Sequence, residues 1–227
     1  MRFSIIVFPG SNCDHDCEYA IRQVLKNPVE MIWHKNTDLK NPDCVVIPGG
    51  FSYGDYLRTG AIARFSPIME SIFNFANKGG LVIGICNGFQ ILCEAQFLPG
   101  VLLKNKNLRF VCRNTYVRVD EVDTPFTNQC KNSSVLSMPI AHGEGNFFID
   151  EEGLKKLEDQ HQIIMRYCNS KGQITDESNP NGSLKNIAGI CNQARNIFGL
   201  MPHPERVCEK ELGGIDGQLI WQSISNS

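Results

Sequence analysis

Short apolar runs in the first half of the chain end at turns rich in glycine or proline, and helical patterns lie between them. Each run is long enough for one strand, and each intervening segment spaces its apolar residues as an amphipathic helix does. Short apolar strands that alternate with helices predict a parallel sheet covered on both faces. The expected strands are residues 2–8, 29–33, 44–47 and 81–85, and the expected helices are residues 16–25, 67–76 and 88–96.

The second half of the chain has a different pattern. Polar stretches rich in turn residues, 128–134 and 175–185, interrupt segments that alternate as strands do. We therefore predict one α/β domain over residues 1–227, with a mainly parallel central sheet flanked by helices and additional mixed or antiparallel strands in the second half. Here the expected strands are residues 109–119, 163–167, 187–191 and 197–200, followed by a closing helix at 219–224.

Ligands of open parallel sheets bind at the carboxyl ends of the strands, so the turns there are the first places to look for chemistry. One of them is Gly84-Ile85-Cys86-Asn87-Gly88, directly after an expected strand. A nucleophile between two such glycines is typical of a tight strand-to-helix turn that lifts the side chain out of the backbone. A lone cysteine after a strand is more often a core residue, but the flanking glycines favour Cys86 as a nucleophile.

A base and an acid come from the segment Pro202-His203-Pro204-Glu205. The proline after His203 favours an extended backbone, in which residues two apart point the same way. A thiolate paired with an imidazole that a carboxylate holds is the working set of a cysteine acyl-transfer enzyme. The alternative for Glu205 is a solvated acid in the charged segment 205–211.

The turn Pro48-Gly49-Gly50 follows another expected strand. A glycine-rich turn at a strand end can aim a backbone N–H at a developing oxyanion, and such a donor contributes about 3 kcal/mol to transition-state stabilisation. By itself this sequence indicates an ordinary turn. Beside a Cys/His pair it predicts an oxyanion hole made of the backbone N–H groups of Gly50 and Asn87.

Charge and composition exclude several functions. The net charge of −2 and the absence of a basic run give no reason to expect nucleic acid or a membrane surface as a partner. The apolar start is too short for an export signal or a membrane span, so we expect a cytoplasmic protein. No phosphate-binding loop or dinucleotide fingerprint occurs. The ten cysteines do not form a dense disulfide framework, and Cys13-Asp14-His15-Asp16-Cys17 lacks a second Cys/His pair, so we expect no metal site.

Five segments together resemble the class I, or triad-type, glutamine amidotransferases. Within that class the chain is most similar to the glutaminase subunits of phosphoribosylformylglycinamidine synthase. The elbow around Cys86 is common to the whole class, whereas Ser11-Asn12-Cys13-Asp14 and Phe51-Ser52-Tyr53-Gly54-Asp55-Tyr56-Leu57-Arg58 narrow the choice. The matching segments are residues 8–14, 48–58, 84–90, 141–145 and 201–206.

The resemblance implies a role for each site residue. Cys86 would attack the glutamine carboxamide, His203 would transfer protons, and Glu205 would hold the imidazole. The amides of Gly50 and Asn87 would face the oxyanion. The residues expected to shape the glutamine pocket are Phe51, Gln90 and His142.

The resemblance also implies partners. L-glutamine is the expected substrate. A large ATP-using synthetase subunit would use the ammonia to make formylglycinamidine ribonucleotide in purine biosynthesis, with a small accessory subunit in the complex. The chain would then be the glutaminase component of a carbon–nitrogen ligase. It would carry no cofactor, and ATP and Mg²⁺ would bind only to the synthetase.

Three alternatives stay open on the sequence. The chain could be the glutaminase subunit of another amidotransferase, a stand-alone cysteine hydrolase or peptidase on a similar fold, or a regulatory module whose triad is inactive. The His-x-Glu arrangement and the segment 53–58 argue against a peptidase. Intact Cys86, His203 and Glu205 argue against an inactive module.

Overall fold

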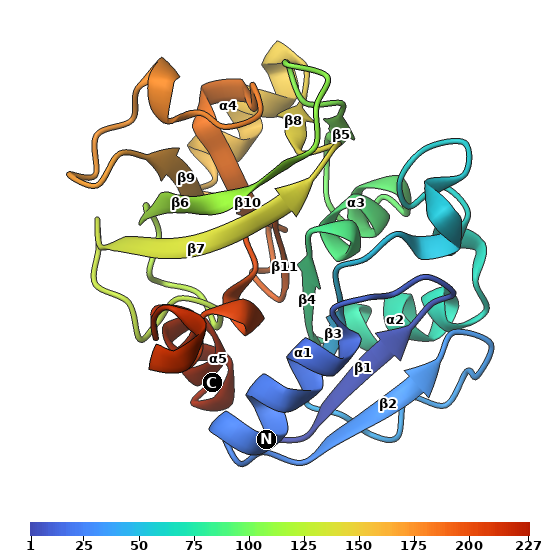
Figure 1. The fold of residues 1–227 in the computed structure, drawn as a ribbon. Coiled ribbons are helices and arrows are strands. Elements are labelled where there is room, and N and C mark those ends of the chain that lie inside the picture. The colour runs from blue at the N-terminus through green and yellow to red at the C-terminus, as the bar shows by residue number, and fades with distance from the viewer.

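A nine-stranded mixed sheet runs through the whole molecule, which the computed structural model describes from residue 1 to residue 227 (Figure 1). Its strands are β1 (Phe3–Val7), β2 (Val29–Trp33), β3 (Cys44–Ile47), β4 (Leu81–Ile85), β6 (Val111–Val119), β7 (Val135–His142), β9 (Ile163–Cys168), β10 (Ile187–Cys191) and β11 (Ile197–Leu200). Their order across the sheet is β2-β1-β3-β4-β11-β10-β9-β6-β7. A separate antiparallel pair joins β5 (Val101–Leu103) to β8 (Asn146–Phe148).

The sheet has a parallel half and an antiparallel half. Strands β2, β1, β3, β4 and β11 pair in parallel, whereas β10, β9, β6 and β7 pair antiparallel. The inner parallel strands β1, β3, β4 and β11 are almost continuously apolar because both of their faces are buried. This arrangement confirms the predicted fold class of a mainly parallel sheet with mixed strands added in the second half.

Helices cover the parallel half on both faces. They are α1 (Asp14–Tyr19), which continues as a wider π-helical turn over Ala20–Val24, α2 (Ile68–Asn77), α3 (Asn87–Glu94) and α5 (Gln218–Ser225). Helix α4 (Glu151–Asp159) lies beside the antiparallel half instead (Figure 1). The connection from β1 to β2 runs towards one sheet edge, and that from β3 to β4 runs the other way. Since such connections are right-handed, α1 and α2 lie on opposite faces (Figure 1).

Strand β7 lies at one edge of the sheet and was not among the expected strands. Its residues alternate between buried and half-buried positions, which is the strand pattern. Pro139 interrupts that pattern in the sequence, but a proline is tolerated at a sheet edge because its missing N–H faces no neighbouring strand. This strand matters because its C-terminal half lies against the turn that carries Cys86.

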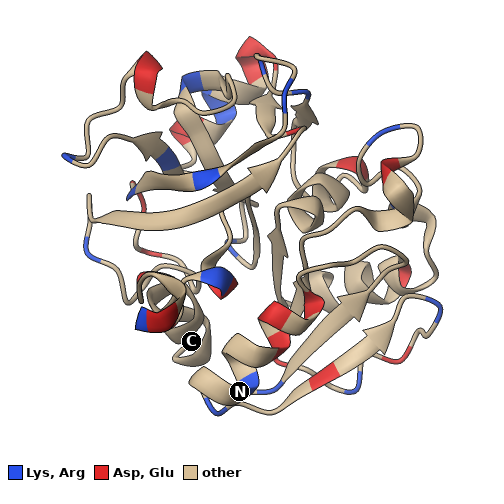
Figure 2. Cartoon of the chain, in the orientation of Figure 1, with Lys and Arg blue, Asp and Glu red and all other residues tan.

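Charged residues of both signs are scattered over the two halves of the molecule (Figure 2). The two signs are mixed in this view, in keeping with the net charge of −2. None of the helices has the length and apolar character needed to cross a membrane.

Candidate active site

Cys86 occupies a sharp turn between β4 and α3. Its backbone has φ +52° and ψ −102°, outside the regions that L-residues ordinarily adopt. Its two glycine neighbours permit this turn. A Cβ on Gly88 would lie 1.9 Å from the carbonyl oxygen of Ile47, and one on Gly84 would lie 2.5 Å from Leu92 Cδ1. The predicted elbow is therefore present, and its strained residue is the nucleophile candidate.

Strand pairing brings His203 to Cys86 across a long sequence separation. Strand β11 is the parallel neighbour of β4, with Leu200 opposite Ile85. The N–H of Cys86 donates to the carbonyl of Leu200 over 2.8 Å, so the two strand ends are level. The chain then continues from β11 to His203, whose N–H donates to the carbonyl of Pro139 over 2.9 Å.

His203 and Glu205 form a buried pair. His203 Nδ1 lies 2.6 Å from Glu205 Oε1, and the two residues are 1% and 2% exposed. This geometry contradicts the alternative in which Glu205 is a solvated surface acid. Burial opposes a charge on the ring, but the charges of Glu205 and Cys86 outweigh it and raise the pKa of His203 well above its usual range. An imidazolium beside a thiolate is the reactive form of a cysteine nucleophile.

His203 Nε2 is buried and has no hydrogen-bond partner in the protein. Buried polar atoms are nearly always paired, and the groups beside this ring are the thiols of Cys13 and Cys86, which contribute to the raised pKa of His203. Cys86 itself is 4% exposed, and its Sγ lies 3.6 Å from the carbonyl oxygen of Ala141 in β7.

Cys13 is a site neighbour that the sequence reasoning missed. Its Sγ accepts from Arg206 Nη2 over 3.0 Å. A Cβ on Gly49 would lie 3.0 Å from Cys13 Sγ, 2.8 Å from His203 Cε1 and 3.5 Å from Cys86 Cβ, so these three side chains surround Gly49. Burial raises the pKa of the Cys13 thiol. Its position in the sequence could have indicated this, because the turn after β1 lies at the same sheet edge as the turns after β3 and β4.

The same cluster could offer ligands to a metal ion. Donor atoms of Cys13, His203 and Glu205 lie within 4.8 Å of one another. However, the His203 ring and the Glu205 carboxylate already bond each other at 2.6 Å, which fits a shared proton better than two separate metal ligands. His15, the imidazole of the segment 13–17, points to solvent with its side chain 81% exposed.

The turn after β3 places Gly50 beside the elbow. Gly50 faces Ser11 in an isolated bridge, and its neighbours make the hydrogen bonds there, from Asn12 N to Gly49 O and from Phe51 N to Gly10 O. The N–H of Gly50 therefore points away from Ser11. Asn87 is the first residue of α3, where backbone N–H groups lack helical acceptors. Both predicted oxyanion donors are thus at the strand ends that flank Cys86.

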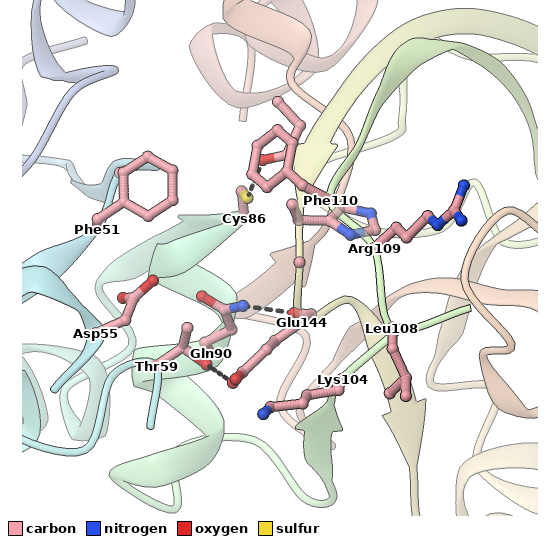
Figure 3. Close-up of a pocket in the computed structure, with 14 residues that line it drawn as sticks. Phe51, Asp55, Thr59, Cys86, Gln90, Lys104, Leu108, Arg109, Phe110 and Glu144 are labelled. Carbon is pink, nitrogen blue, oxygen red and sulfur yellow. Dashed lines mark hydrogen bonds between the residues drawn. The ribbon is translucent and has the colours of Figure 1, made fainter. Parts of the chain in front are cut away.

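A cavity of about 270 Å³ opens in front of Cys86 (Figure 3). Phe51, Gln90 and His142, the residues expected to shape the glutamine pocket, all line this cavity. Phe51 lies near Phe110, with a ring-centroid distance of 6.3 Å, and is 44% exposed.

Gln90 and His142 are both held by other protein groups. Gln90 accepts from Asn87 Nδ2 over 2.9 Å and donates to the backbone carbonyl of Glu144. His142 Nδ1 lies 3.1 Å from Asn105 Oδ1, and burial together with the charge of His203 lowers the pKa of His142 to about 4. The ring is therefore neutral. Both side chains serve as cavity wall in this structure, and their contact with glutamine stays a prediction.

Comparison with known proteins agrees with this geometry. The CobB/CobQ-like glutamine amidotransferase domain matches residues 1–215. The chain belongs to this family. Among related amidotransferases, the phosphoribosylformylglycinamidine synthase subunit PurQ of Koribacter versatilis is 56% identical over 224 residues, which cover 99% of this chain and 97% of that protein. The subunit of the same name from Aquifex aeolicus is 50% identical over 99% of both chains.

A solved structure supports the same family. A chain in the structure of PurLQS from Thermotoga maritima superposes with a TM-score of 0.87 at 40% identity, covering 99% of this chain and 97% of that one. The fold and the family resemblance predicted from the motifs are thereby confirmed.

Proposed function

We propose that this chain is the glutaminase subunit of a phosphoribosylformylglycinamidine synthase. It hydrolyses L-glutamine to glutamate and ammonia, and a separate ATP-dependent subunit uses the ammonia. The observation that carries the chemistry is the Cys86–His203–Glu205 arrangement at one end of the cavity, with His203 Nε2 unpartnered. Full-length relatives at 50–56% identity support the choice of synthase.

The first half of the reaction is an acyl transfer to sulfur. The Cys86 thiolate attacks the carboxamide carbon of glutamine, and the oxygen becomes an oxyanion within reach of the Gly50 and Asn87 amides. His203 gives its Nε2 proton to the leaving nitrogen as the C–N bond breaks. Ammonia departs, and a glutamyl thioester remains on Cys86.

The second half reverses the proton movement. The neutral imidazole of His203 takes a proton from water, and the resulting hydroxide attacks the thioester carbon. The C–S bond breaks, Cys86 leaves as a thiolate beside the imidazolium, and glutamate is released. Glu205 holds the ring in one orientation throughout and transfers no proton.

The ATP-dependent step is assigned to the synthetase partner. The sequence carries neither a phosphate-binding loop nor a dinucleotide fingerprint. ATP and Mg²⁺ therefore belong to the large subunit in this proposal. A small accessory subunit completes the proposed complex on the strength of the family resemblance.

The test is glutamate release from L-glutamine, first by the isolated chain and then with the synthetase subunit, formylglycinamide ribonucleotide and ATP-Mg²⁺ present. Slow release that rises sharply in the full mixture supports a coupled synthase glutaminase. Fast release that the mixture leaves unchanged would indicate a stand-alone hydrolase. No release in either case would indicate a different partner.

A further inference from the structure

The cavity in front of Cys86 contains a carboxylate that the triad chemistry does not use. Asp55 lies on its wall, in a turn where three successive residues have positive φ, Tyr53 at +55°, Gly54 at +67° and Asp55 at +53°. Left-handed backbone at non-glycine residues is costly and is retained mainly where it positions a functional group. Tyr53 anchors the turn, since its hydroxyl lies 3.1 Å from both His34 Nδ1 and Ser66 Oγ.

The Asp55 carboxylate has no counter-ion. Its Oδ1 is buried without a hydrogen-bond partner. A second acid, Glu144, lines the same cavity. Burial and, to a smaller extent, the negative charge of Glu144 raise the pKa of Asp55 to about 6.

Glu144 is held firmly in this position. Thr59 Oγ1 donates to Glu144 Oε2 over 2.7 Å, and Gln90 holds the Glu144 backbone carbonyl (Figure 3). Gln90 is in turn fixed by Asn87, the residue next to the nucleophile. The position of Glu144 is thereby tied to the reacting end of the cavity.

Two cations border the same cavity, Lys104 and Arg109. Neither forms an ion pair with any acid of the protein. The cavity therefore has a nucleophile at one end, with His203 Nε2 buried and unpartnered behind it, and unpaired charges of both signs along its walls. A substrate that enters carboxamide first and carries both charges at its far end complements this arrangement.

We propose that Asp55 and Glu144 bind the α-ammonium group of L-glutamine, while Lys104 and Arg109 receive its α-carboxylate. This inference rests on the proposed glutaminase function and adds the basis of its selectivity. The two acids repel each other in the empty cavity, so the substrate's positive charge relieves a repulsion as it binds. An amide without the α-ammonium group leaves that repulsion in place.

The pH dependence follows from this placement. The charged residues that line the cavity together with Asp55 are Glu144, Lys104 and Arg109, and of these Glu144 acts on the pKa of Asp55. The side chain of Arg58 is paired with Glu94 at 2.6 and 2.7 Å. With a pKa of about 6 in the empty site, Asp55 is ionised above that pH and protonated below it. A protonated carboxyl cannot pair with an ammonium group. We expect KM for L-glutamine to rise as the pH falls through about 6, and KM for an analogue without the ammonium group to stay level.

The decisive test compares L-glutamine with glutaramate, which has hydrogen in place of the α-ammonium group. In the assembled synthase, Asp55→Asn should lower kcat/KM for L-glutamine roughly 10- to 100-fold, mainly through KM, because it removes a charged hydrogen-bond partner. The same substitution should change kcat/KM for glutaramate less than about 3-fold, since that analogue never uses the charge. Asp38→Asn, at an exposed surface acid, is the control and should change neither substrate's kinetics.

Stability provides a second readout. A carboxyl whose pKa is raised by folding destabilises the folded state, fully at pH values above the folded pKa of about 6, and this penalty is relieved as the pH falls through that value towards the unfolded pKa. Asp55→Asn should therefore keep or raise the Tm of the unliganded protein at pH 7.5. A merely structural role would lower it. Glu144→Gln is the second variant. Like Asp55→Asn, it should lower kcat/KM for L-glutamine more than kcat/KM for glutaramate.

The outcomes separate the two proposals. If the unmodified synthase releases no glutamate from L-glutamine, the proposed function itself is overturned. If glutamine is hydrolysed but Asp55→Asn lowers kcat/KM equally for glutamine and glutaramate, or for neither, the ammonium site is overturned while the glutaminase stands. A loss of kcat/KM that is confined to L-glutamine supports the ammonium site.

Discussion

At the scale of single residues, we predict that loss of His203 lowers the reaction rate more than loss of the Glu205 charge. His203→Ala removes the proton carrier and should lower kcat for glutamate release on the order of 10²- to 10⁴-fold. Glu205→Gln keeps the shape but weakens the orientation and the charge on the ring, so kcat should fall less, on the order of 10-fold. Steady-state glutamate release in the assembled synthase measures both.

Glu211→Gln is the matched control for Glu205→Gln, because Glu211 is an exposed acid in the same charged segment. It should leave kcat unchanged. Wild-type activity in Glu205→Gln would contradict the orienting role that the 2.6 Å bond to His203 supports.

The sequence predicted the triad residues because local rules apply to each. The two glycines around Cys86 predict the tight turn, and the proline after His203 predicts the extended segment. The burial of Glu205 and the place of Cys13 depend instead on which strand ends meet, and no local rule contains that information. Asp55 was missed for the same reason, since its cavity forms only when the turn after β3 meets β7.

At the scale of elements, the closest contact in the elbow predicts a large loss of stability. Gly88→Ala would put a Cβ 1.9 Å from the carbonyl oxygen of Ile47, so α3 has to move away from β3. We expect the free energy of unfolding to fall by about 3 kcal/mol or more. Chemical denaturation measures it.

Gly79→Ala provides the comparison for Gly88→Ala. Gly79 has φ +88°, but a methyl group added there would meet nothing within 4 Å, so only backbone strain applies and the cost should be about 1 kcal/mol. If the two variants lose the same free energy of unfolding, the close approach of α3 to β3 is not the reason that Gly88 is required.

Several elements were predictable and others were not, for physical reasons. Strands β2, β3, β4, β10 and β11 match their predicted bounds. The last four are short buried apolar runs between turns, and β2 is a short run that alternates between buried and more exposed residues. Helix α4 was missed because it packs only a narrow apolar stripe, with Leu157 its single buried residue. The β5–β8 pair has three residues in each strand, too few for an alternating pattern to stand out.

At the scale of the whole molecule, the site exists because three parallel strands end together. Strands β3, β4 and β11 are neighbours, and their turns carry Gly50, Cys86 and His203. The antiparallel half contributes β7, whose Ala141 carbonyl approaches Cys86 and whose end leads to Glu144. The sequence predicted that active residues follow strand ends, but strand order is a tertiary property that the local patterns do not contain.

The most direct test of the proposed function is product formation by an assembled synthase that carries Cys86→Ala, with either L-glutamine or ammonium chloride as the nitrogen source. We predict that glutamine-dependent formation of formylglycinamidine ribonucleotide is abolished, because no thioester can form. Ammonia-dependent formation should persist near the wild-type rate, because that chemistry belongs to the synthetase. Loss of both activities in a folded, assembled complex, or retention of the glutamine-dependent one, would contradict the assignment of Cys86 and the division of labour between the subunits.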